Sequence, residues 1–259
     1  MPATPTQGRF VWYDLMTPDP DAAREFYHRT FGWDSEAWEG PEVYAMWKRG
    51  DTPFGGVMTL PAEAAEAGAP PHWLGYVATA DGEAVCARAG ELGGKVLHGP
   101  HDVPDKGRFA ILADPQGAVI AAWQSSREYE VSDDPPAVGE PSWHELATTG
   151  YQAAFDFYAD LFGWRLLQDM DMGEGWMYRI YGIGERQLGG IFDRPPEMPA
   201  NAWLYYVRVA DLGTTLEAVI AHGGQVVNGP MEVPGGDRVA QCLDPQGAMF
   251  ALHERAAQA

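Results

Sequence analysis

Two residues in the second half of the chain, Glu145 and His253, form the pair best suited to proton-transfer chemistry. A carboxylate and an imidazole can act as general base and general acid near neutral pH. The same groups can also ligate a metal ion. The corresponding positions of the first half hold Asp14 and Trp123, so only the second half has the imidazole. A structural role for the carboxylates, with the backbone or an arginine as partner, is the alternative.

Aromatic residues on predicted strands are candidates for contact with a small molecule. Their rings can stack on a flat or cationic organic ligand, although core packing is the simpler interpretation of each one. The predicted ligand-binding residues are Trp12, Asp14, Trp143, Tyr205, Trp123 and Trp176. His98 and His101, which flank Gly99-Pro100, are a candidate two-histidine contact. The sequence contains no CxxC, His-x-x-x-His, GxSxG, P-loop or GxGxxG motif, so those chemistries lose their usual support.

These candidates lie within a sequence that repeats itself. Residues 12–33 (WYDLMTPDPDAAREFYHRTFGW) align without a gap to residues 143–164 (WHELATTGYQAAFDFYADLFGW), with 10 identities in 22 positions at an offset of 131. A second block repeats at an offset of 130 and carries GGxV, GPxxVP and DPQGA in both copies. A repeat of this length indicates a duplicated domain.

The order of predicted elements is β-α-β-β-β, four times over. Asp19 followed by Pro20 predicts a helix start, and Gly32 predicts its end. The Asp-Pro-Gln-Gly segments predict type I turns. Residues Pro61–Pro71 are predicted to form a link or loop. We predict a first domain over 1–129 (modules 10–60 and 72–126), a linker over 130–141, and a second domain over 142–259 (modules 142–193 and 202–254).

Composition limits the partners. The chain has 259 residues, a hydrophobic fraction of 46% and a formal net charge of −20 at pH 7. This charge disfavours nucleic acid and anionic membranes as partners and leaves a small-molecule ligand. No stretch has the length of a membrane span, and the N-terminus lacks the pattern of a secretion signal. We expect a cytoplasmic monomer or homodimer in which Cys86 and Cys242 are buried free thiols.

The ordered set of FY, FGW, GG and DPxG, present twice, resembles the vicinal oxygen chelate superfamily, which includes glyoxalases, bleomycin-resistance proteins and extradiol dioxygenases. More narrowly, the chain is similar to two-domain actinobacterial glyoxalase-like proteins labelled hydroxylases. The resemblance implies an α+β fold of four βαβββ modules. Each tandem domain would then be a cupped, eight-stranded mixed sheet with its helices outside.

Metal-using members of that superfamily hold a divalent ion in the cup through His and Glu. The resemblance places those ligands at Trp12 and Ala121 in the first domain and at Trp143 and Ala251 in the second. Further strand positions fall on Gly75 and Tyr205. None of these residues is a usual ligand for a divalent cation. The resemblance therefore does not identify a cofactor. If a metal ion binds, Glu145 and His253 are the candidate ligands. Strand alternation would turn both toward the cup.

Two classes of function follow. Most of the superfamily is enzymatic, so the first hypothesis is an enzyme acting on a small oxygenated organic metabolite, with hydroxylase-, lyase- or isomerase-like chemistry. The alternative is a metal-free protein that sequesters a small molecule or antibiotic in aromatic-lined cups.

Overall fold

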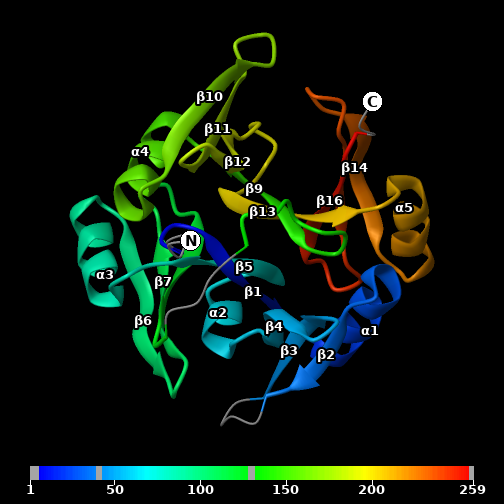
Figure 1. Ribbon diagram of the computed structural model, residues 1–259, viewed down its shortest axis with the longest axis horizontal. Helices are drawn as coiled ribbons and strands as arrows, with labels where there is room; N and C mark the ends of the chain where they lie inside the picture. The colour runs from blue at the N-terminus through cyan, green and yellow to red at the C-terminus, as the bar shows by residue number, and fades with distance from the viewer. Residues whose placement is uncertain (1–5, 39–42, 128–131, 257–259) are drawn as a thin grey trace. The chain divides into compact units, whose positions relative to one another are not determined.

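The computed structural model describes residues 6–38, 43–127 and 132–256 (Figure 1). The first two residues of the predicted linker, 130 and 131, and the ends of the chain lie outside these ranges. Sixteen strands and five helices are present in the described part of the chain.

The elements of the first repeat follow the predicted order. They are β1 (Phe10–Thr17), α1 (Pro20–Phe31), β2 (Asp34–Ala37), β3 (Tyr44–Arg49), β4 (Thr52–Thr59), α2 (Ala62–Glu66), β5 (His72–Ala78), α3 (Gly82–Glu91), β6 (Lys95–Val103), β7 (Gly107–Ala113) and β8 (Val119–Ser125). Their strands form one eight-stranded sheet in the order β2-β3-β4-β1-β5-β8-β7-β6.

The second repeat has the same architecture. Its elements are β9 (Pro141–Thr148), α4 (Tyr151–Phe162), β10 (Arg165–Asp171), β11 (Met177–Ile183), β12 (Arg186–Asp193), β13 (Ala202–Val209), α5 (Leu212–Ala221), β14 (Gln225–Glu232), β15 (Arg238–Leu243) and β16 (Met249–Glu254). The sheet order is β10-β11-β12-β9-β13-β16-β15-β14. Both sheets combine parallel and antiparallel pairs, which confirms the predicted α+β fold of two tandem mixed sheets.

Local sequence explains where the first helix begins and ends. The Asp19 carboxylate accepts a hydrogen bond from the N–H of Ala22 at 3.0 Å, and Pro20 occupies the first helical position. Gly32 ends the helix in the left-handed conformation, with φ of 71°. The predicted boundaries of α1 are therefore confirmed.

The structure departs from the sequence prediction in two places. Within Pro61–Pro71, which was predicted as a link or loop, residues 62–66 form the short helix α2. The second is β6, a single strand that continues through Gly99-Pro100 to Val103, because its pairing with β7 resumes beyond a register shift between His98 and His101. An irregular strand of this kind has no clean two-residue alternation for the sequence to display.

The compact units of the structure do not follow the tandem repeat. The first unit contains the chain up to Val11, Gly75–Asp134 and His144–Trp203, and the second contains Trp12–Leu74, Pro135–Trp143 and the chain from Leu204 on. Each unit therefore combines a module of one tandem repeat with a module of the other.

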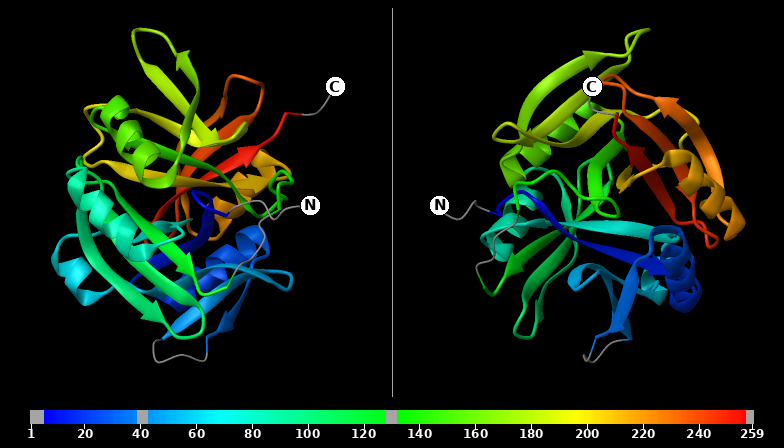
Figure 2. Two further views of the ribbon diagram at one scale, coloured as in Figure 1. Left: turned by 60° about the vertical axis from the view of Figure 1, so that its left-hand side comes forward. Right: turned by 45° about the vertical axis from the view of Figure 1, so that its right-hand side comes forward.

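In the first unit, helices α3 and α4 lie side by side (Figures 1 and 2). Arg88 of α3 binds Asp160 of α4 through two hydrogen bonds of 2.6 and 2.7 Å. Deeper in the unit, the Tyr158 hydroxyl donates to Asp114 Oδ2 at 3.0 Å and accepts from the Trp203 indole at 3.3 Å. The FY helix of the second repeat thus binds the DPQG turn of the first.

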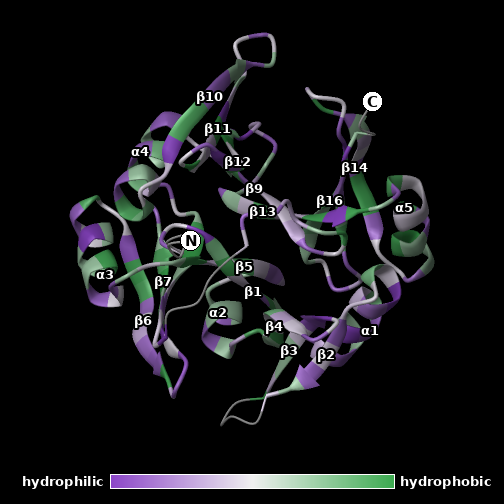
Figure 3. Ribbon diagram, in the orientation of Figure 1, coloured by the Kyte–Doolittle hydropathy of each residue, from purple (hydrophilic) through white to green (hydrophobic). Residues whose placement is uncertain are grey.

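The second unit makes the reciprocal contact. Helices α1 and α5 are neighbours (Figure 2). The Tyr27 hydroxyl donates to Asp244 Oδ2 at 3.2 Å and accepts from the Trp73 indole at 3.0 Å. Tyr27 and Tyr158 are fully buried, and burial raises the pKa of both Asp114 and Asp244. Hydrophobic and hydrophilic residues alternate along the helices, as one-sided packing requires (Figure 3).

The two cysteines are buried free thiols, as predicted. Burial raises the pKa of the Cys242 thiol to about 12, so this group stays protonated near neutral pH. None of the helices in the described part of the chain is both long and apolar enough to cross a membrane.

Candidate functional site

A carboxylate–tyrosine pair lies on the first module. The Tyr44 hydroxyl of β3 donates to Asp14 Oδ1 of β1 at 2.7 Å, and the Trp12 indole N–H lies 2.9 Å from the same oxygen. A side chain at Gly56 of β4 would overlap the Tyr44 ring, because its Cβ would approach the hydroxyl to 1.9 Å. Burial and the Asp14 charge raise the pKa of Tyr44 well above its usual range, so the hydroxyl keeps its proton. Two predicted ligand-binding residues, Trp12 and Asp14, are thus brought together.

The third module repeats this arrangement with a longer carboxylate. The Tyr178 hydroxyl of β11 donates to Glu145 Oε2 of β9 at 2.8 Å. Gly190 of β12 lies beneath the Tyr178 ring, where a Cβ would approach ring and hydroxyl atoms to between 2.0 and 2.2 Å. Tyrosine on the third strand and glycine on the fourth therefore accompany the first-strand carboxylate in both repeats. Neither tyrosine was among the predicted site residues, because both lie outside the two aligned blocks, at an offset of 134.

Five side chains of the first unit form a partly exposed surface that we call the aromatic face. Its members are Tyr76, His98, His101, Phe109 and Trp123. The Phe109 ring lies 5.7 Å from each imidazole and 6.0 Å from Tyr76, and Trp123 lies opposite Phe109 in the β7–β8 pair. The two imidazoles are exposed, with ring centroids 5.6 Å apart, and their predicted role as a two-histidine contact stays a prediction.

Trp176 lies elsewhere in the same unit, just before β11. Its side chain is 41% exposed, its indole N–H donates to the Asp193 carbonyl at 3.3 Å, and its ring meets Phe192 edge-on at 5.3 Å. Its predicted contact with a ligand stays a prediction.

His253 binds two polar groups of the second unit. Its Nε2 lies 2.7 Å from Asp237 Oδ2, and its Nδ1 lies 3.0 Å from the Ser142 hydroxyl. The imidazole side chain is 14% exposed and the Asp237 side chain 32%. Burial raises the pKa of Asp237, but hydrogen bonds from the Ala256 N–H and the His253 ring outweigh burial, so the net shift is downward. An ionised carboxylate therefore faces the imidazole.

Glu145 and His253 belong to different compact units, and each has the partners described above. Their predicted joint action stays a prediction. Ser142 and Asp237 were not among the predicted site residues. A comparison of the two repeats could have found them, because Ser142 aligns with Val11 and Asp237 aligns with Gly107, so both polar groups occur in one copy only.

The two remaining aromatic candidates, Trp143 of the third module and Tyr205 of the fourth, are associated with different faces of the fourth module. Trp143 packs against Leu204, Tyr206, Val239 and Ala251. Tyr206 lies opposite Ala251 in the parallel β13–β16 pair, so strand alternation puts Tyr205 on the other face.

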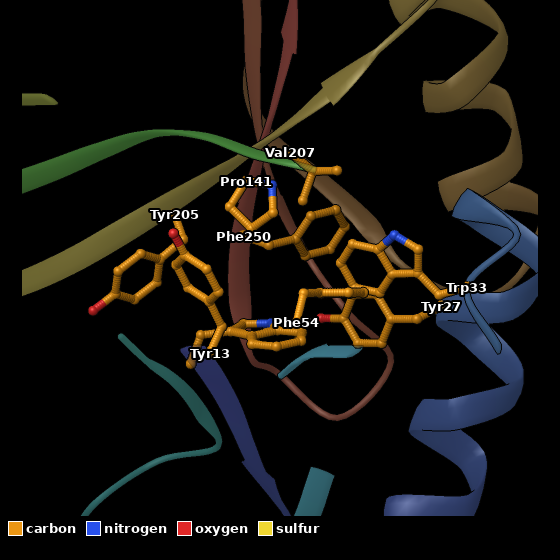
Figure 4. Close-up of a pocket in the computed structure, with 9 residues that line it drawn as sticks. Tyr13, Tyr27, Trp33, Phe54, Pro141, Tyr205, Val207 and Phe250 are labelled. Carbon is orange, nitrogen blue, oxygen red and sulfur yellow. Dashed lines mark hydrogen bonds between the residues drawn. The ribbon is translucent and has the colours of Figure 1, made fainter. Parts of the chain in front are cut away.

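There Tyr205 meets Tyr13 edge-on at 5.7 Å and borders a cavity of about 20 Å³ with Pro141 and Phe250 (Figure 4). Such a space holds about one water molecule. Tyr205 therefore occupies an aromatic core at this cavity, and its role in ligand binding remains untested.

The positions at which the family fold implies a metal do not fit a divalent cation. Ala121 and Ala251 are fully buried and have no donor atom, and the Trp12 indole nitrogen carries a hydrogen that Asp14 accepts. Within the described ranges, no group of three or more His, Cys, Asp or Glu side chains is arranged to hold a metal ion.

The chain belongs to the glyoxalase/bleomycin resistance protein/dioxygenase superfamily, whose family model matches residues 9–122 and 141–252. It is 33% identical over 258 residues to the CFP32 protein of Mycobacterium tuberculosis, whose name proposes a glyoxylase; the match covers 97% of each chain. It is 32% identical over 268 residues to the anthracycline biosynthesis protein DnrV of Streptomyces peucetius, covering 95% of this chain and 93% of DnrV.

Solved structures share the fold at low sequence identity. The 2,3-dioxygenase LapB from Pseudomonas sp. KL28 aligns with a TM-score of 0.68 and 11% identity, over 98% of this chain and 94% of LapB. The Mn(II)-bound glyoxalase from Novosphingobium aromaticivorans aligns with a TM-score of 0.65 and 15% identity, over 98% and 84% of the respective chains. These similarities concern the fold, and the chemistry depends on the residues present in this chain.

Proposed function

We propose that this chain is a small-molecule enzyme whose substrate is a flat, oxygenated aromatic compound. The observation that carries the proposal is the aromatic face, where Phe109 and Trp123 are half-buried and His98 and His101 are exposed. Exposed aromatic rings that gather on one surface favour stacking with a planar ligand. The naming of DnrV as an anthracycline biosynthesis protein supports the same substrate class.

The carboxylate–tyrosine pairs would supply the polar groups that such a substrate needs. Hydroxyl and carbonyl groups on a ring can exchange hydrogen bonds with Tyr178 and Glu145 or with Tyr44 and Asp14. Glu145 and His253 are the proposed acid/base residues, because a carboxylate and an imidazole can each accept or donate a proton in catalysis. Trp12, Trp143 and Trp176 would contribute further ring contacts.

The first experiment measures binding. We would titrate the protein with 1,4-dihydroxyanthraquinone, a flat oxygenated probe, and follow quenching of tryptophan fluorescence. Phe109→Val places on the aromatic face the residue found at the same position of the other repeat, Val239. We expect Kd to rise about tenfold, since a ring–ring contact contributes on the order of 1 kcal/mol. Val239→Ala is the matched control, and an equal effect in both variants would contradict the proposal.

The second experiment separates catalysis from binding. Conversion of the probe is followed by mass spectrometry in the wild type, Glu145→Gln and His253→Gln. The enzyme proposal expects slower conversion in both variants with little change in Kd, as for residues that act only in the chemical step. Measuring the metal content of the same preparations tests whether Glu145 and His253 instead hold an ion.

Sequestration of the ligand is the second candidate function. It is favoured by the Trp and Ala residues that stand where metal-using relatives of this fold would need ligands. Tight binding of the probe without any conversion would replace the enzyme proposal by this one.

A further inference from the structure

Ser142, His253 and Asp237 form a continuous hydrogen-bonded chain within the second unit. The serine hydroxyl of β9 lies 3.0 Å from Nδ1 of the imidazole on β16, and Nε2 lies 2.7 Å from the Asp237 carboxylate just before β15. A hydroxyl, an imidazole and a carboxylate in this order are the components that activate serine nucleophiles in several unrelated folds.

The carboxylate selects the tautomer of the imidazole. Because Asp237 is ionised, it accepts a hydrogen bond from Nε2–H, and the lone pair of the neutral ring is then on Nδ1. That lone pair faces the Ser142 hydroxyl. The Tyr206 carbonyl is a second acceptor, 3.2 Å from the same hydroxyl, so the single serine proton is shared between two directions. Asp237 is itself held by the N–H of Ala256 at 2.8 Å.

The other repeat shows that the fold does not require this chain of contacts. The equivalent positions hold Val11, Trp123 and Gly107, so all three polar groups are missing there together. The backbone around them is the same in both copies, since β7–β8 and β15–β16 pair in equivalent register. A contact needed only to build the sheet would be expected in both repeats.

We propose that Ser142, His253 and Asp237 are a nucleophilic triad that transfers the acyl group of a small ester to water. His253 Nδ1 takes the hydroxyl proton while Ser142 Oγ forms a bond to the ester carbonyl carbon. The carbonyl–alkoxy bond then breaks, and the alkoxide leaves with the proton from His253. Water, deprotonated by His253, attacks the acyl-serine and releases the carboxylic acid, which restores the free hydroxyl. Asp237 is a positioning residue that holds the ring and stabilises its protonated form.

This activity goes beyond the proposed function and does not depend on an aromatic substrate. The ligand class is an ester with a small acyl group, because the Ser142 side chain is half-buried, with the Tyr206 carbonyl 3.2 Å and the His253 ring nitrogen 3.0 Å from its hydroxyl.

Covalent labelling tests the nucleophile directly. The full-length protein is incubated with a fluorophosphonate probe, digested, and analysed by mass spectrometry for the labelled peptide. The expected result is a phosphonyl adduct on Ser142, found in the wild type without relying on any variant. Absence of an adduct, or an adduct on a different residue alone, overturns the proposal.

Hydrolysis of 4-nitrophenyl acetate measures the contribution of each member. We expect Ser142→Ala to abolish the enzymatic acetate release, and His253→Gln to lower kcat about 10²-fold or more. Asp237→Asn should lower kcat and change the shape of the kcat–pH profile, whereas a smaller folded fraction would scale the whole profile down without changing its shape. Ser126→Ala, which removes a serine hydroxyl bonded to the Asp105 carbonyl in the other unit, is the matched control and should leave the rate unchanged.

The outcomes are distinguishable from those of the proposed function. Equal labelling rates in the wild type and His253→Gln would show an unassisted serine and would overturn the triad. Failure of the anthraquinone probe to bind would leave the labelling result intact, because the aromatic face lies in the first unit and the triad in the second.

Discussion

The two compact units share their scaffold contacts and differ in their exposed chemistry. In each unit a buried tyrosine of an FY helix binds the aspartate of a DPQG turn and accepts from a tryptophan indole. In the first unit the strands on either side of the turn carry Phe109 and Trp123 of the aromatic face, whereas the equivalent strands of the second unit carry Val239 and His253. The two copies therefore share the contacts that build the fold and differ at the surface positions.

The largest expected effect concerns the shared contact. Asp114 accepts the N–H groups of Gln116 and Ala118 and the Tyr158 hydroxyl, and Asp244 accepts the equivalent three donors. We expect Asp114→Ala and Asp244→Ala each to lower the free energy of unfolding by about 4 kcal/mol, because buried donors lose their acceptor. Urea denaturation measures both.

Asparagine at the same positions is the matched control for this prediction. Its side-chain oxygen still accepts from the backbone N–H groups, so the loss should be markedly smaller than with alanine. A large loss in one unit and none in the other would break the equivalence of the two scaffolds.

The second prediction concerns a group found in one unit only. His144 is buried, lies 2.7 Å from the Leu188 carbonyl through Nδ1, and stacks on Phe10 with ring centroids 3.9 Å apart. Burial lowers the pKa of His144 from 6.5 to about 4, with a smaller contribution from the positive charge of Arg186. The equivalent residue of the other repeat is Tyr13, which does not titrate in this range.

The direction of the pH effect on stability follows from proton binding at His144. Between pH 6.5 and 4 the unfolded chain binds more protons at His144 than the folded chain does, so stability falls as the pH falls. The loss from this residue approaches about 3 kcal/mol near pH 4. His144→Asn retains a donor for Leu188 without titrating, and its unfolding free energy should fall less over the same pH range. If the unfolding free energies of the wild type and His144→Asn fell equally with pH, the low pKa would not belong to His144.

The third prediction sharpens the functional difference between the units. Trp123→Leu should raise the Kd of 1,4-dihydroxyanthraquinone about tenfold, because the half-buried indole opposite Phe109 is lost from the aromatic face. His253→Leu, at the equivalent position of the other unit, should leave this Kd unchanged. Isothermal titration calorimetry measures Kd for both variants. A raised Kd in His253→Leu and an unchanged Kd in Trp123→Leu would indicate that the ligand binds in the second unit.

The smallest expected effect concerns the carboxylate–tyrosine pairs that both repeats keep. Tyr44→Phe and Tyr178→Phe should each cost about 1 kcal/mol, the loss of one partly buried hydrogen bond. A double-mutant cycle of Tyr178→Phe with Glu145→Gln isolates the coupling in thermal denaturation. A coupling near zero would mean that this hydrogen bond contributes nothing to stability and would strengthen the assignment of both groups to ligand contact.

The sequence by itself determined the duplication, the order of elements and the fold class. Local signals sufficed for these because caps, glycine ends and turn residues act over a few positions, as Asp19 and Gly32 do for α1. The sequence also supplied the candidate residues on each strand, including His253 and Trp123. It did not reveal α2, whose five residues have no side-chain N-cap hydrogen bond.

Only the tertiary structure decided which copy of each motif binds which. Tyr27 binds Asp244, 217 residues away, and not the Asp114 of its own repeat, because α1 packs in the unit that contains α5. The two copies of a motif are chemically alike, so nothing local distinguishes the partners. For the same reason the partners of His253 emerged only from the fold: Ser142 and Asp237 lie on separate segments that the second unit brings together.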